Sequence, residues 1–239
     1  MTTGYTPGHT DGAVSFMARR SLQTHGQFFL PHLSPGLDVL DLGCGPGTIS
    51  RDLAAAVEPG WVVAVDQADR LSVRAENLTF TSASCYDLPL AGQSVDRVFS
   101  HALFEHLASP LDALAEAKRV LRPGGVIGLC SPDWGGFLLS PPSRAVDESL
   151  ECYRDLMISN GGDPLAGRKL GTWLEQAGFR EIHVAARYEN YVGSATIAQY
   201  LADQLDEAGS RHHATSLREW AAGGTTLFAQ CWVSATGRR

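Results

Sequence analysis

The sequence predicts an α/β protein built on a doubly wound, mostly parallel sheet of seven strands. Short runs rich in apolar and β-branched residues alternate with helical patterns through the first 134 residues. A glycine-rich turn, GCGPG at 43–47, follows the first of these runs and precedes a helical pattern. Strands that alternate with helices favour a parallel sheet covered on both faces. A glycine turn at such a junction is where sheets of this kind bind nucleotides.

Each element is predicted from its apolar pattern and from the residues that end it. The helix at 110–121, for example, carries Leu111, Leu114 and Leu121 at helical spacing and ends at an Arg-Pro-Gly-Gly stop. The predicted strands cover 37–43, 61–67, 78–84, 95–103, 126–134, 182–192 and 225–237. The predicted helices cover 48–57, 68–76, 110–121, 144–158, 166–179, 195–208 and 214–222, with 135–143 as a turn-rich connector and 1–30 mostly helical from Asp11.

Composition and charge argue against several classes of partner. The chain has 19 basic and 26 acidic residues, a formal net charge of −7 and no Lys/Arg run, which disfavours nucleic acid as a partner. No apolar run approaches the roughly 20 residues that cross a bilayer. The N-terminus lacks the pattern of a secretory signal. We therefore expect a cytoplasmic protein without a membrane partner, either a monomer or a homodimer.

The cysteines give no sign of a disulfide framework or a metal site. They show no CxxC spacing, are odd in number and lie mostly in apolar stretches: Cys44, Cys85, Cys130, Cys152 and Cys231. In a protein expected in the cytoplasm, such cysteines are predicted to be reduced thiols. No spacing of His, Asp and Glu resembles a metal site either, so no metal is expected.

The turn after the first strand places Gly43, Gly45 and Gly47 within five positions. Glycine costs backbone entropy in a folded chain, so this cluster indicates either a turn too tight for Cβ atoms or a ligand that touches the backbone. Asp66 ends the second predicted strand, where an acidic side chain accepts hydrogen bonds from the hydroxyls of a ribose. The alternatives are a turn that serves packing alone and an Asp66 that caps the helix predicted at 68–76.

These residues resemble the first motif of the class I S-adenosylmethionine-dependent methyltransferases. VLDLGCGPG at 39–47 has a G-x-G-x-G pattern preceded by an acid, Asp41, where dehydrogenases usually show G-x-G-x-x-G. ASCYDLPLAGQSVDRVFSHALFEHL at 83–107 and RVLRPGG at 119–125 resemble later motifs of the family, in the same order. The similarity spans 36–134 and points to the ubiquinone/menaquinone-biosynthesis subgroup, part of which opens with a sequence similar to the YTPGH found here.

The resemblance implies a Rossmann-like methyltransferase fold in a single domain, 1–239. S-adenosylmethionine would be the cofactor and S-adenosylhomocysteine its product. An N-terminal cap at 1–30, a cofactor-binding core at 36–134 and lid segments at 135–160 and 194–222 are expected around the site.

The resemblance also implies a role for each matching residue of the cofactor site. The methionine end and the adenosyl group would lie against the turn, formed by Asp41, Gly43, Cys44, Gly45 and Gly47. Asp66 would bind the ribose, and Gln67 would lie beside the adenine. Ser84 stands where the family often has an adenine-binding Asp, which leaves the backbone N–H of Cys85 as the expected contact.

Two further groups of residues would reach the methionine part of the cofactor. Ser100 and His101 end the fourth strand, beside the expected position of the sulfonium. Tyr5, His9 and Arg20 lie in the N-terminal cap, where related proteins hold the carboxylate of the cofactor.

Methyl transfer from a sulfonium is an in-line displacement, so approach and alignment matter more than a catalytic dyad. His101 is the candidate general base if the acceptor carries a proton, with positioning as the alternative role. His106 is expected to be structural and Glu105 to lie on a solvated helix face. The acceptor is expected to be a small molecule with an O, N or C nucleophile, in a pocket lined by Asp133, Trp134, Phe137, Tyr153 and Tyr191.

Several other functions share parts of this pattern. A nicotinamide-dependent dehydrogenase has the same topology, but the glycine spacing and RVLRPGG count against it. A nucleic-acid methyltransferase is disfavoured by the acidic balance and because SHAL at 100–103 replaces an N/D-P-P-Y/F tetrapeptide. A cofactor-binding module without catalysis and a methyltransferase that acts on a protein remain alternatives.

Overall fold

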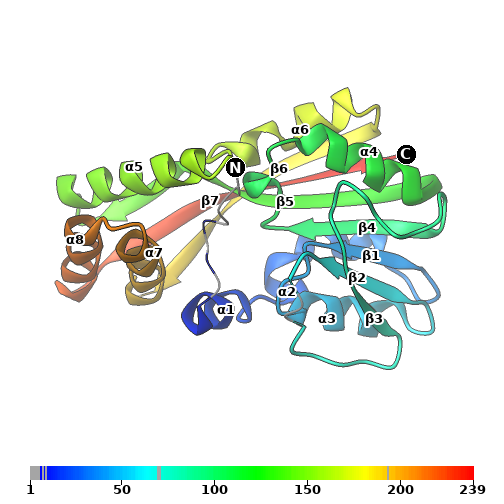
Figure 1. Cartoon of the computed structure of the whole chain (residues 1–239), viewed down its shortest axis with the longest axis horizontal. Helices are drawn as coiled ribbons and strands as arrows, with labels where there is room; N and C mark the ends of the chain where they lie inside the picture. The colour runs from blue at the N-terminus through cyan, green and yellow to red at the C-terminus, as the bar shows by residue number, and fades with distance from the viewer. Residues whose placement is uncertain (1–5, 7, 9, 69–70, 193) are drawn as a thin grey trace.

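The protein forms one seven-stranded sheet with the strand order β3-β2-β1-β4-β5-β7-β6 (Figure 1). The computed structural model describes residues 6, 8, 10–68, 71–192 and 194–239. The strands are β1 (Val39–Leu42), β2 (Val62–Asp66), β3 (Leu78–Ser82), β4 (Val95–His101), β5 (Leu121–Ser140), β6 (Arg180–Val192) and β7 (Leu227–Arg238). Only β7 runs antiparallel to its neighbours among these strands. The predicted α/β class with a mostly parallel seven-stranded sheet is confirmed.

Helices cover both faces of the sheet. α3 (Thr48–Val57) packs on β2 and β3, whereas α4 (Pro110–Val120) and α6 (Ala166–Gln176) pack together against the other face. The alternation of side chains along β1 supplies both cores. Leu40 and Leu42 pack in the α4/α6 core, and Val39 packs in the α3 core.

A second lobe lies beyond the nucleotide-binding half of the sheet. β5, β6 and β7 extend into it, and α5 (Arg144–Ser159), α7 (Ala195–Glu207) and α8 (Arg211–Ala222) cover them (Figure 1). The N-terminal helix α1 (Asp11–Met17) joins this lobe, because the ring of Phe16 stacks on Tyr200 with centroids 4.2 Å apart. α2 (Leu22–His25) and the 3-10 helix η1 (Gln27–His32) then lead to β1.

The helix predicted at 68–76 is wrong. Residues 71–75 have no regular structure, and residues 69 and 70 lie outside the described residues. The N–H and hydroxyl of Ser72 both donate to the Pro46 carbonyl, at 3.1 and 3.0 Å. A Cβ atom added to Gly47 would collide with Leu71. The segment therefore packs on the glycine turn, and this tertiary contact replaces the hydrogen bonds of a helix.

The connector predicted at 135–143 is also wrong, because β5 continues through most of it. Strand pairing with β7 stops after Asp133, skips residues 134–136 and resumes from Phe137 to Ser140. The skipped residues form a bulge in which a Cβ on Gly136 would lie 2.9 Å from the Cβ of Cys231. Glycine therefore allows this close approach of β5 to β7.

The connections that follow β1 and β4 run to opposite faces of the sheet, although the two strands are parallel neighbours. This arrangement leaves a crevice at their carboxyl ends. The Ser100 hydroxyl at the end of β4 donates to the Leu42 carbonyl of β1 at 2.8 Å. The bond joins the two strands directly beside the glycine turn.

Removal of this bond should cost stability. Ser100→Ala leaves the buried Leu42 carbonyl without that donor, so we expect a loss of about 1–2 kcal/mol in the free energy of unfolding. Ser94→Ala is the matched control, because the buried Ser94 hydroxyl has no hydrogen-bond partner among the described residues. It should change stability by less than about 0.5 kcal/mol. Urea unfolding followed by circular dichroism measures both, and equal losses in the two variants would contradict the assignment.

Candidate active site

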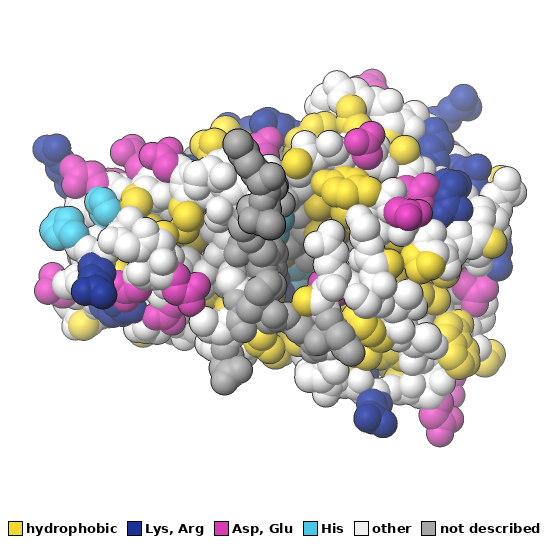
Figure 2. Space-filling view, in the orientation of Figure 1, with side chains coloured by type: hydrophobic (Ala, Val, Ile, Leu, Met, Phe, Trp, Pro, Cys, Tyr) yellow, Lys and Arg dark blue, Asp and Glu magenta, His cyan; other side chains and the backbone are white. Residues whose placement is uncertain are grey.

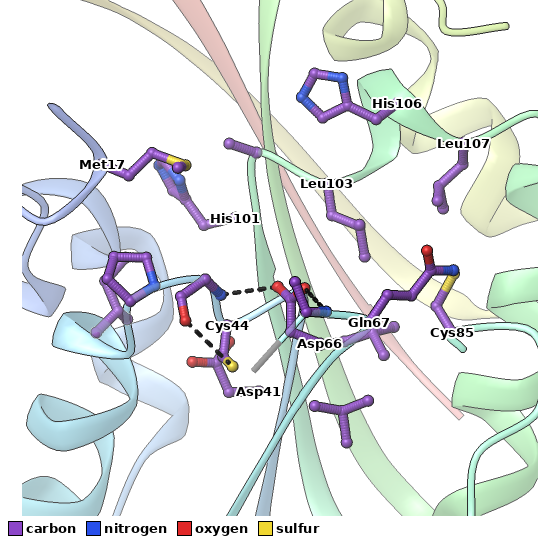
Figure 3. A pocket seen from close by; sticks show the side chains of 18 of the residues that line it. Met17, Asp41, Cys44, Asp66, Gln67, Cys85, His101, Leu103, His106 and Leu107 are labelled. Carbon is purple, nitrogen blue, oxygen red and sulfur yellow. Dashed lines mark hydrogen bonds between the residues drawn. The ribbon is translucent and has the colours of Figure 1, made fainter. Parts of the chain in front are cut away.

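A cavity of about 510 Å³ lies at the carboxyl ends of β1, β2 and β4. The sequence-predicted cofactor residues in its wall are Arg20, Asp41, Gly43, Cys44, Gly45, Asp66, Gln67, Cys85 and His101. Figure 3 shows Gln67 and Cys85 on one side of this space and Met17 and His101 on the other. The fold thus brings together the N-terminal segment, the glycine turn and the loops after three strands. Tyr5 and His9 lie outside the described residues.

The glycine turn serves both packing and access. Gly43, Gly45 and Gly47 all have positive φ, at 78°, 51° and 81°, where side chains with a Cβ are strained. A Cβ on Gly43 would lie 3.0 Å from that of Leu103, whereas nothing lies within 4 Å of a Cβ on Gly45. Gly45 therefore leaves a space against the backbone that a ligand can occupy. Gly47 is the N-cap residue of α3 and does not line the cavity.

Asp66 closes the turn from the end of β2. Its Oδ2 accepts a hydrogen bond from the Gly45 N–H at 2.9 Å, and its Oδ1 accepts one from the Ala68 N–H at 3.1 Å (Figure 3). A carboxylate has about four acceptor sites, so both oxygens can accept further hydrogen bonds from a ligand. The backbone contacts hold the carboxylate in the cavity wall before any ligand arrives.

Asp41 lies under the turn and is almost fully buried. Burial is the main cause that raises its pKa to about 7, although the Ser50 hydroxyl donates to its Oδ2 at 2.6 Å and opposes that change. Because Ser50 is in the first turns of α3, this bond connects β1 to α3. Asp41 thus positions the turn and also lines the cavity.

Ser84 and Ser100 do not line the cavity. The Ser84 hydroxyl accepts a hydrogen bond from the Tyr86 N–H at 3.2 Å, within a tight turn that pairs Ser84 with Asp87. The Ser100 hydroxyl is engaged with β1, as described above. Direct contact of these two side chains with the cofactor remains a prediction.

Two histidines line the cavity, and both are neutral near neutral pH. His101 is 7% exposed, its ring lies 4.8 Å from that of Trp232, and neither ring nitrogen has a hydrogen-bond partner among the described residues. Burial, followed by the charge of Arg20, lowers its pKa well below the usual value. The same two causes lower the pKa of His106 to about 3. Both imidazoles are therefore weak bases.

A second, smaller cavity adjoins the first and is called here the aromatic chamber. It has a volume of about 30 Å³ and shares Met17, Arg20, Ala102 and His106 with the larger cavity. Its other lining residues are Phe16, Glu105, Pro132, Trp134, Tyr153, Tyr191, Ile197, Tyr200, Gln230 and Trp232. Three of the five residues predicted for an acceptor pocket, Trp134, Tyr153 and Tyr191, are thus brought together.

The other two predicted acceptor residues lie elsewhere. Asp133 accepts hydrogen bonds from the Arg168 guanidinium at 2.6 and 2.7 Å and from the Gly135 N–H at 2.9 Å, so it holds the bulge of β5 against α6. Phe137 packs against Phe228 in the core of the second lobe, with ring centroids 6.4 Å apart. Neither residue lines the two cavities.

The structure corrects the expectation for Glu105. This residue lies in the 3-10 helix η2 (Phe104–His106), is 2% exposed and is not solvated. The Ser131 hydroxyl donates to its Oε2 at 2.8 Å, and its Oε1 lies 3.7 Å from Nε2 of His106. Burial raises the pKa of Glu105 to about 7. The segment is too short to bury a helix face, so helical periodicity gave no signal for this burial.

Gln230 and Trp232 were not predicted as site residues. Both lie on β7, far from the glycine turn in sequence, and they reach the chamber because β7 inserts between β5 and β6. An apolar alternation at 225–237 predicts the strand but not its neighbours. Only the strand order places these side chains near His101.

The surface and the remaining residues show few other features that suggest a site. Figure 2 shows acidic and basic side chains interspersed on the face it presents. Within the part of the chain that the structure describes, no helix could cross a membrane, and no three residues of His, Cys, Asp or Glu are grouped to hold a metal ion.

Comparison with known proteins identifies the domain. Residues 40–129 match the family described as a methyltransferase domain. An uncharacterized methyltransferase of Schizosaccharomyces pombe is 29% identical, over 74% of this chain and 71% of that protein. An uncharacterized 37.1 kDa protein in transposon TN4556 of Streptomyces fradiae is 38% identical, over 61% of this chain and 44% of that protein. The crystal structure of BH2331 from Bacillus halodurans has a TM-score of 0.63 at 16% identity, covering 87% and 96% of the two chains.

Residues 40–129, which carry the glycine turn and Asp66, match a methyltransferase domain, and S-adenosylmethionine is the cofactor that this match indicates. The chain spans about half the length of most of the curated relatives it matches. The names of two such relatives give different acceptors: a tRNA U34 carboxymethyltransferase of Hydrogenovibrio crunogenus and a ubiquinone biosynthesis O-methyltransferase of Cereibacter sphaeroides.

The cavity fits this cofactor on its own geometry. The open space at Gly45 admits a ligand against the backbone, and Asp66 keeps acceptor sites for ribose hydroxyls. The neighbouring wall carries Gln67, Cys85 and the apolar Leu107, against which an adenine ring can pack (Figure 3).

The burial of Glu105 predicts a pH-dependent effect of Glu105→Gln. A carboxyl whose folded pKa is raised from 4.5 to about 7 destabilises the fold progressively as the pH rises between these values. The glutamine variant lacks this penalty, so its unfolding free energy relative to the wild type should increase over the same interval. Asp41→Asn should behave in the same way, since the pKa of Asp41 is also raised to about 7. Urea unfolding across this interval tests both variants, and a difference that is constant with pH would contradict the burial of a charged form.

Proposed function

We propose that the protein transfers a methyl group from S-adenosylmethionine to a small-molecule acceptor with an O, N or C nucleophile. One observation carries the proposal: the cavity at the glycine turn and Asp66 adjoins an aromatic chamber under the second lobe. The first can hold a nucleoside, and the second can hold part of an acceptor. Assignment to the ubiquinone/menaquinone-biosynthesis subgroup belongs to this proposal, supported by the motifs at 39–47, 83–107 and 119–125.

The chain would bind and orient the two reactants. Asp66 would accept hydrogen bonds from the ribose, Gln67 and Cys85 would contact the adenine, and the glycine turn would lie against the methionine part. When bound, S-adenosylmethionine supplies a methyl group on a positively charged sulfur; the new bond to the acceptor forms as the carbon–sulfur bond breaks and sulfur keeps the electron pair. The second lobe, with α1 attached, would keep water from the acceptor.

Neither His101 nor His106 is suited to remove a proton of high pKa. Burial and the charge of Arg20 hold both imidazoles in the neutral form with a low affinity for protons. A general base works best when its pKa lies near the working pH. We therefore propose that the two histidines position the acceptor.

A small acceptor is favoured by the size and lining of the chamber. The chamber lies beside α1 and the larger cavity, and Met17 and Arg20 line both cavities. The net charge of −7 gives no electrostatic advantage to tRNA. We further propose a single domain over 1–239, a cytoplasmic location and a monomer or homodimer. A protein acceptor and a cofactor-binding module without catalysis are alternative outcomes of the experiments below.

Asp66→Ala should weaken the binding of S-adenosylmethionine and S-adenosylhomocysteine by about 10- to 100-fold, the effect of losing a charged acceptor. Asp87→Ala is the matched control, because Asp87 lies nearby but does not line the cavity. Isothermal titration calorimetry measures both. Absence of binding by the wild-type protein at millimolar cofactor would overturn the proposed function, and an unchanged dissociation constant in Asp66→Ala would show that the ribose binds elsewhere.

His101→Ala and His106→Ala should each lower turnover by about tenfold or less, as expected for positioning residues. A screen of cofactor consumption against phenols, carboxylic acids, amines and quinol precursors supplies the acceptor for this assay. A loss of 10²- to 10⁴-fold, on the order seen for general bases, with intact cofactor binding would show that the substituted histidine removes a proton. No consumption with any compound would favour a protein acceptor or a binding module.

A further inference from the structure

The aromatic chamber is too small for a ring but has room for a polar head group. About 10–15 Å³ of such space holds one water molecule, so its volume of about 30 Å³ suits two oxygen-sized atoms. The chamber adjoins the larger cavity, because Met17, Arg20, Ala102 and His106 line both. A head group in the chamber would therefore lie beside the cofactor, with the rest of the acceptor in the larger cavity.

Within the described part of the chain, one buried donor in the chamber wall lacks a partner, and a second has only the Tyr191 hydroxyl nearby. Gln230 is 1% exposed and Trp232 is 3% exposed. Neither Nε2 of Gln230 nor Nε1 of Trp232 has a hydrogen-bond partner among the described residues, although the Tyr191 hydroxyl lies near the indole. An indole N–H can only donate, and a buried donor without a partner is unfavourable. The chamber therefore favours a ligand that supplies hydrogen-bond acceptors.

Arg20 adds a positive charge to the same wall. Its Cζ lies 5.4 Å from the ring centroid of Trp232, which holds the guanidinium over the indole. No carboxylate lies within ion-pair distance of this guanidinium among the described residues. Glu189, an acidic residue on the adjacent strand, instead contacts Nε2 of His25 at 3.2 Å. The guanidinium can thus bind the oxygens of an anion.

Two acidic groups oppose an anion in the chamber: Glu105, which lines it, and Glu189, whose pKa is lowered and whose charge acts on Arg20 and Tyr191. Burial raises the pKa of Glu105 to about 7, so a substantial fraction carries a proton at neutral pH. A bound anion would favour that protonated form, which repels it less and can donate a hydrogen bond. Glu105 therefore weakens, but does not prevent, the binding of an anion next to Arg20.

We propose that the acceptor is an apolar carboxylic acid, whose carboxylate binds Arg20, Gln230 and Trp232 in the chamber and receives the methyl group. This inference rests on the proposed methyl transfer. A lone pair of one carboxylate oxygen forms the bond to the methyl carbon, the carbon–sulfur bond breaks, and sulfur keeps that electron pair. The products are a methyl ester and a neutral thioether. No proton has to leave, which agrees with a site whose histidines are weak bases.

This assignment gives Arg20 a role different from the one implied by the family resemblance. The resemblance places Arg20 at the carboxylate of the cofactor. The position of its guanidinium over Trp232, at the junction of the two cavities, favours the carboxylate of the acceptor. Binding measurements separate the two roles. If Arg20 binds the acceptor, its substitution leaves the affinity for S-adenosylhomocysteine intact, whereas a role at the cofactor predicts a loss of that affinity.

The test uses pairs of probes that differ only in charge. Benzoate, phenylacetate and decanoate are titrated into the full chain saturated with S-adenosylhomocysteine, alongside benzamide, phenylacetamide and decanamide. At least one acid should bind at least tenfold more tightly than its amide. Incubation of that acid with S-adenosylmethionine should yield a product that mild alkali hydrolyses back to the acid, as expected of a methyl ester.

Substitutions then test the three donors. Arg20→Met, Gln230→Leu and Trp232→Phe should each weaken the binding of the acid by about 10- to 100-fold, the effect of a lost hydrogen bond to a charged group. The affinities for the amide and for S-adenosylhomocysteine should stay as in the wild type. Glu105→Gln should strengthen binding of the acid. Arg19→Met is the matched control, because Arg19 is exposed, neighbours Arg20 and lines neither cavity.

The outcomes of these experiments distinguish a failure of the proposed methyl transfer from a failure of the carboxylate inference alone. If S-adenosylhomocysteine does not bind to the wild type, the proposed function fails and the inference fails with it. If the cofactor product binds but every acid and amide bind equally, only the carboxylate inference is overturned. A loss of S-adenosylhomocysteine affinity in Arg20→Met, with acid binding unchanged, would return Arg20 to the cofactor and also overturn the inference.

Discussion

The arrangement of the site depends on the parting of β1 and β4. Two parallel neighbours whose connections leave for opposite faces create a crevice at their carboxyl ends. The bond from Ser100 to the Leu42 carbonyl keeps the strands together up to the point where they part. Asp66, from the next strand, then holds the glycine turn at the rim through the Gly45 N–H. These side-chain-to-backbone contacts within the core shape one part of the cavity, and the N-terminal segment and Asn160 line another part.

The second lobe adds the aromatic chamber beside this crevice. α1 is joined to α7 through the stacking of Phe16 on Tyr200, and Asn160 at the end of α5 donates to the Thr6 hydroxyl at 2.9 Å. On the other side, Asp52 of α3 accepts a hydrogen bond from the Leu22 N–H at 3.0 Å. The N-terminal segment thus bridges the lobe and the nucleotide-binding core. Met17 and Arg20, which line both cavities, lie in this bridging segment.

Burial determines the charges at the junction of the two cavities. Burial lowers the pKa of both His101 and His106 and raises the pKa of Glu105 to about 7. The guanidinium of Arg20 and the buried donors of Gln230 and Trp232 line the same region. Such a region favours a ligand that is already anionic. It is poorly suited to proton abstraction.

The sequence by itself determined the order of most elements and the part of the cavity wall formed by the glycine turn and Asp66. These features are local signals. Each strand, each helix, the glycine turn and the place of Asp66 at the end of a strand can be recognised from the sequence of one short segment. The two wrong predictions, the helix at 68–76 and the connector at 135–143, concern segments whose structure depends on contacts with distant residues. The segment at 71–75 is irregular because it packs on the glycine turn, and β5 continues past its bulge because β7 pairs with it. Only the tertiary structure decided which further residues line the aromatic chamber. Gln230, Trp232 and Glu105 reach the aromatic chamber through the insertion of β7 and the burial of one short turn, and no periodicity within their own segments encodes those contacts.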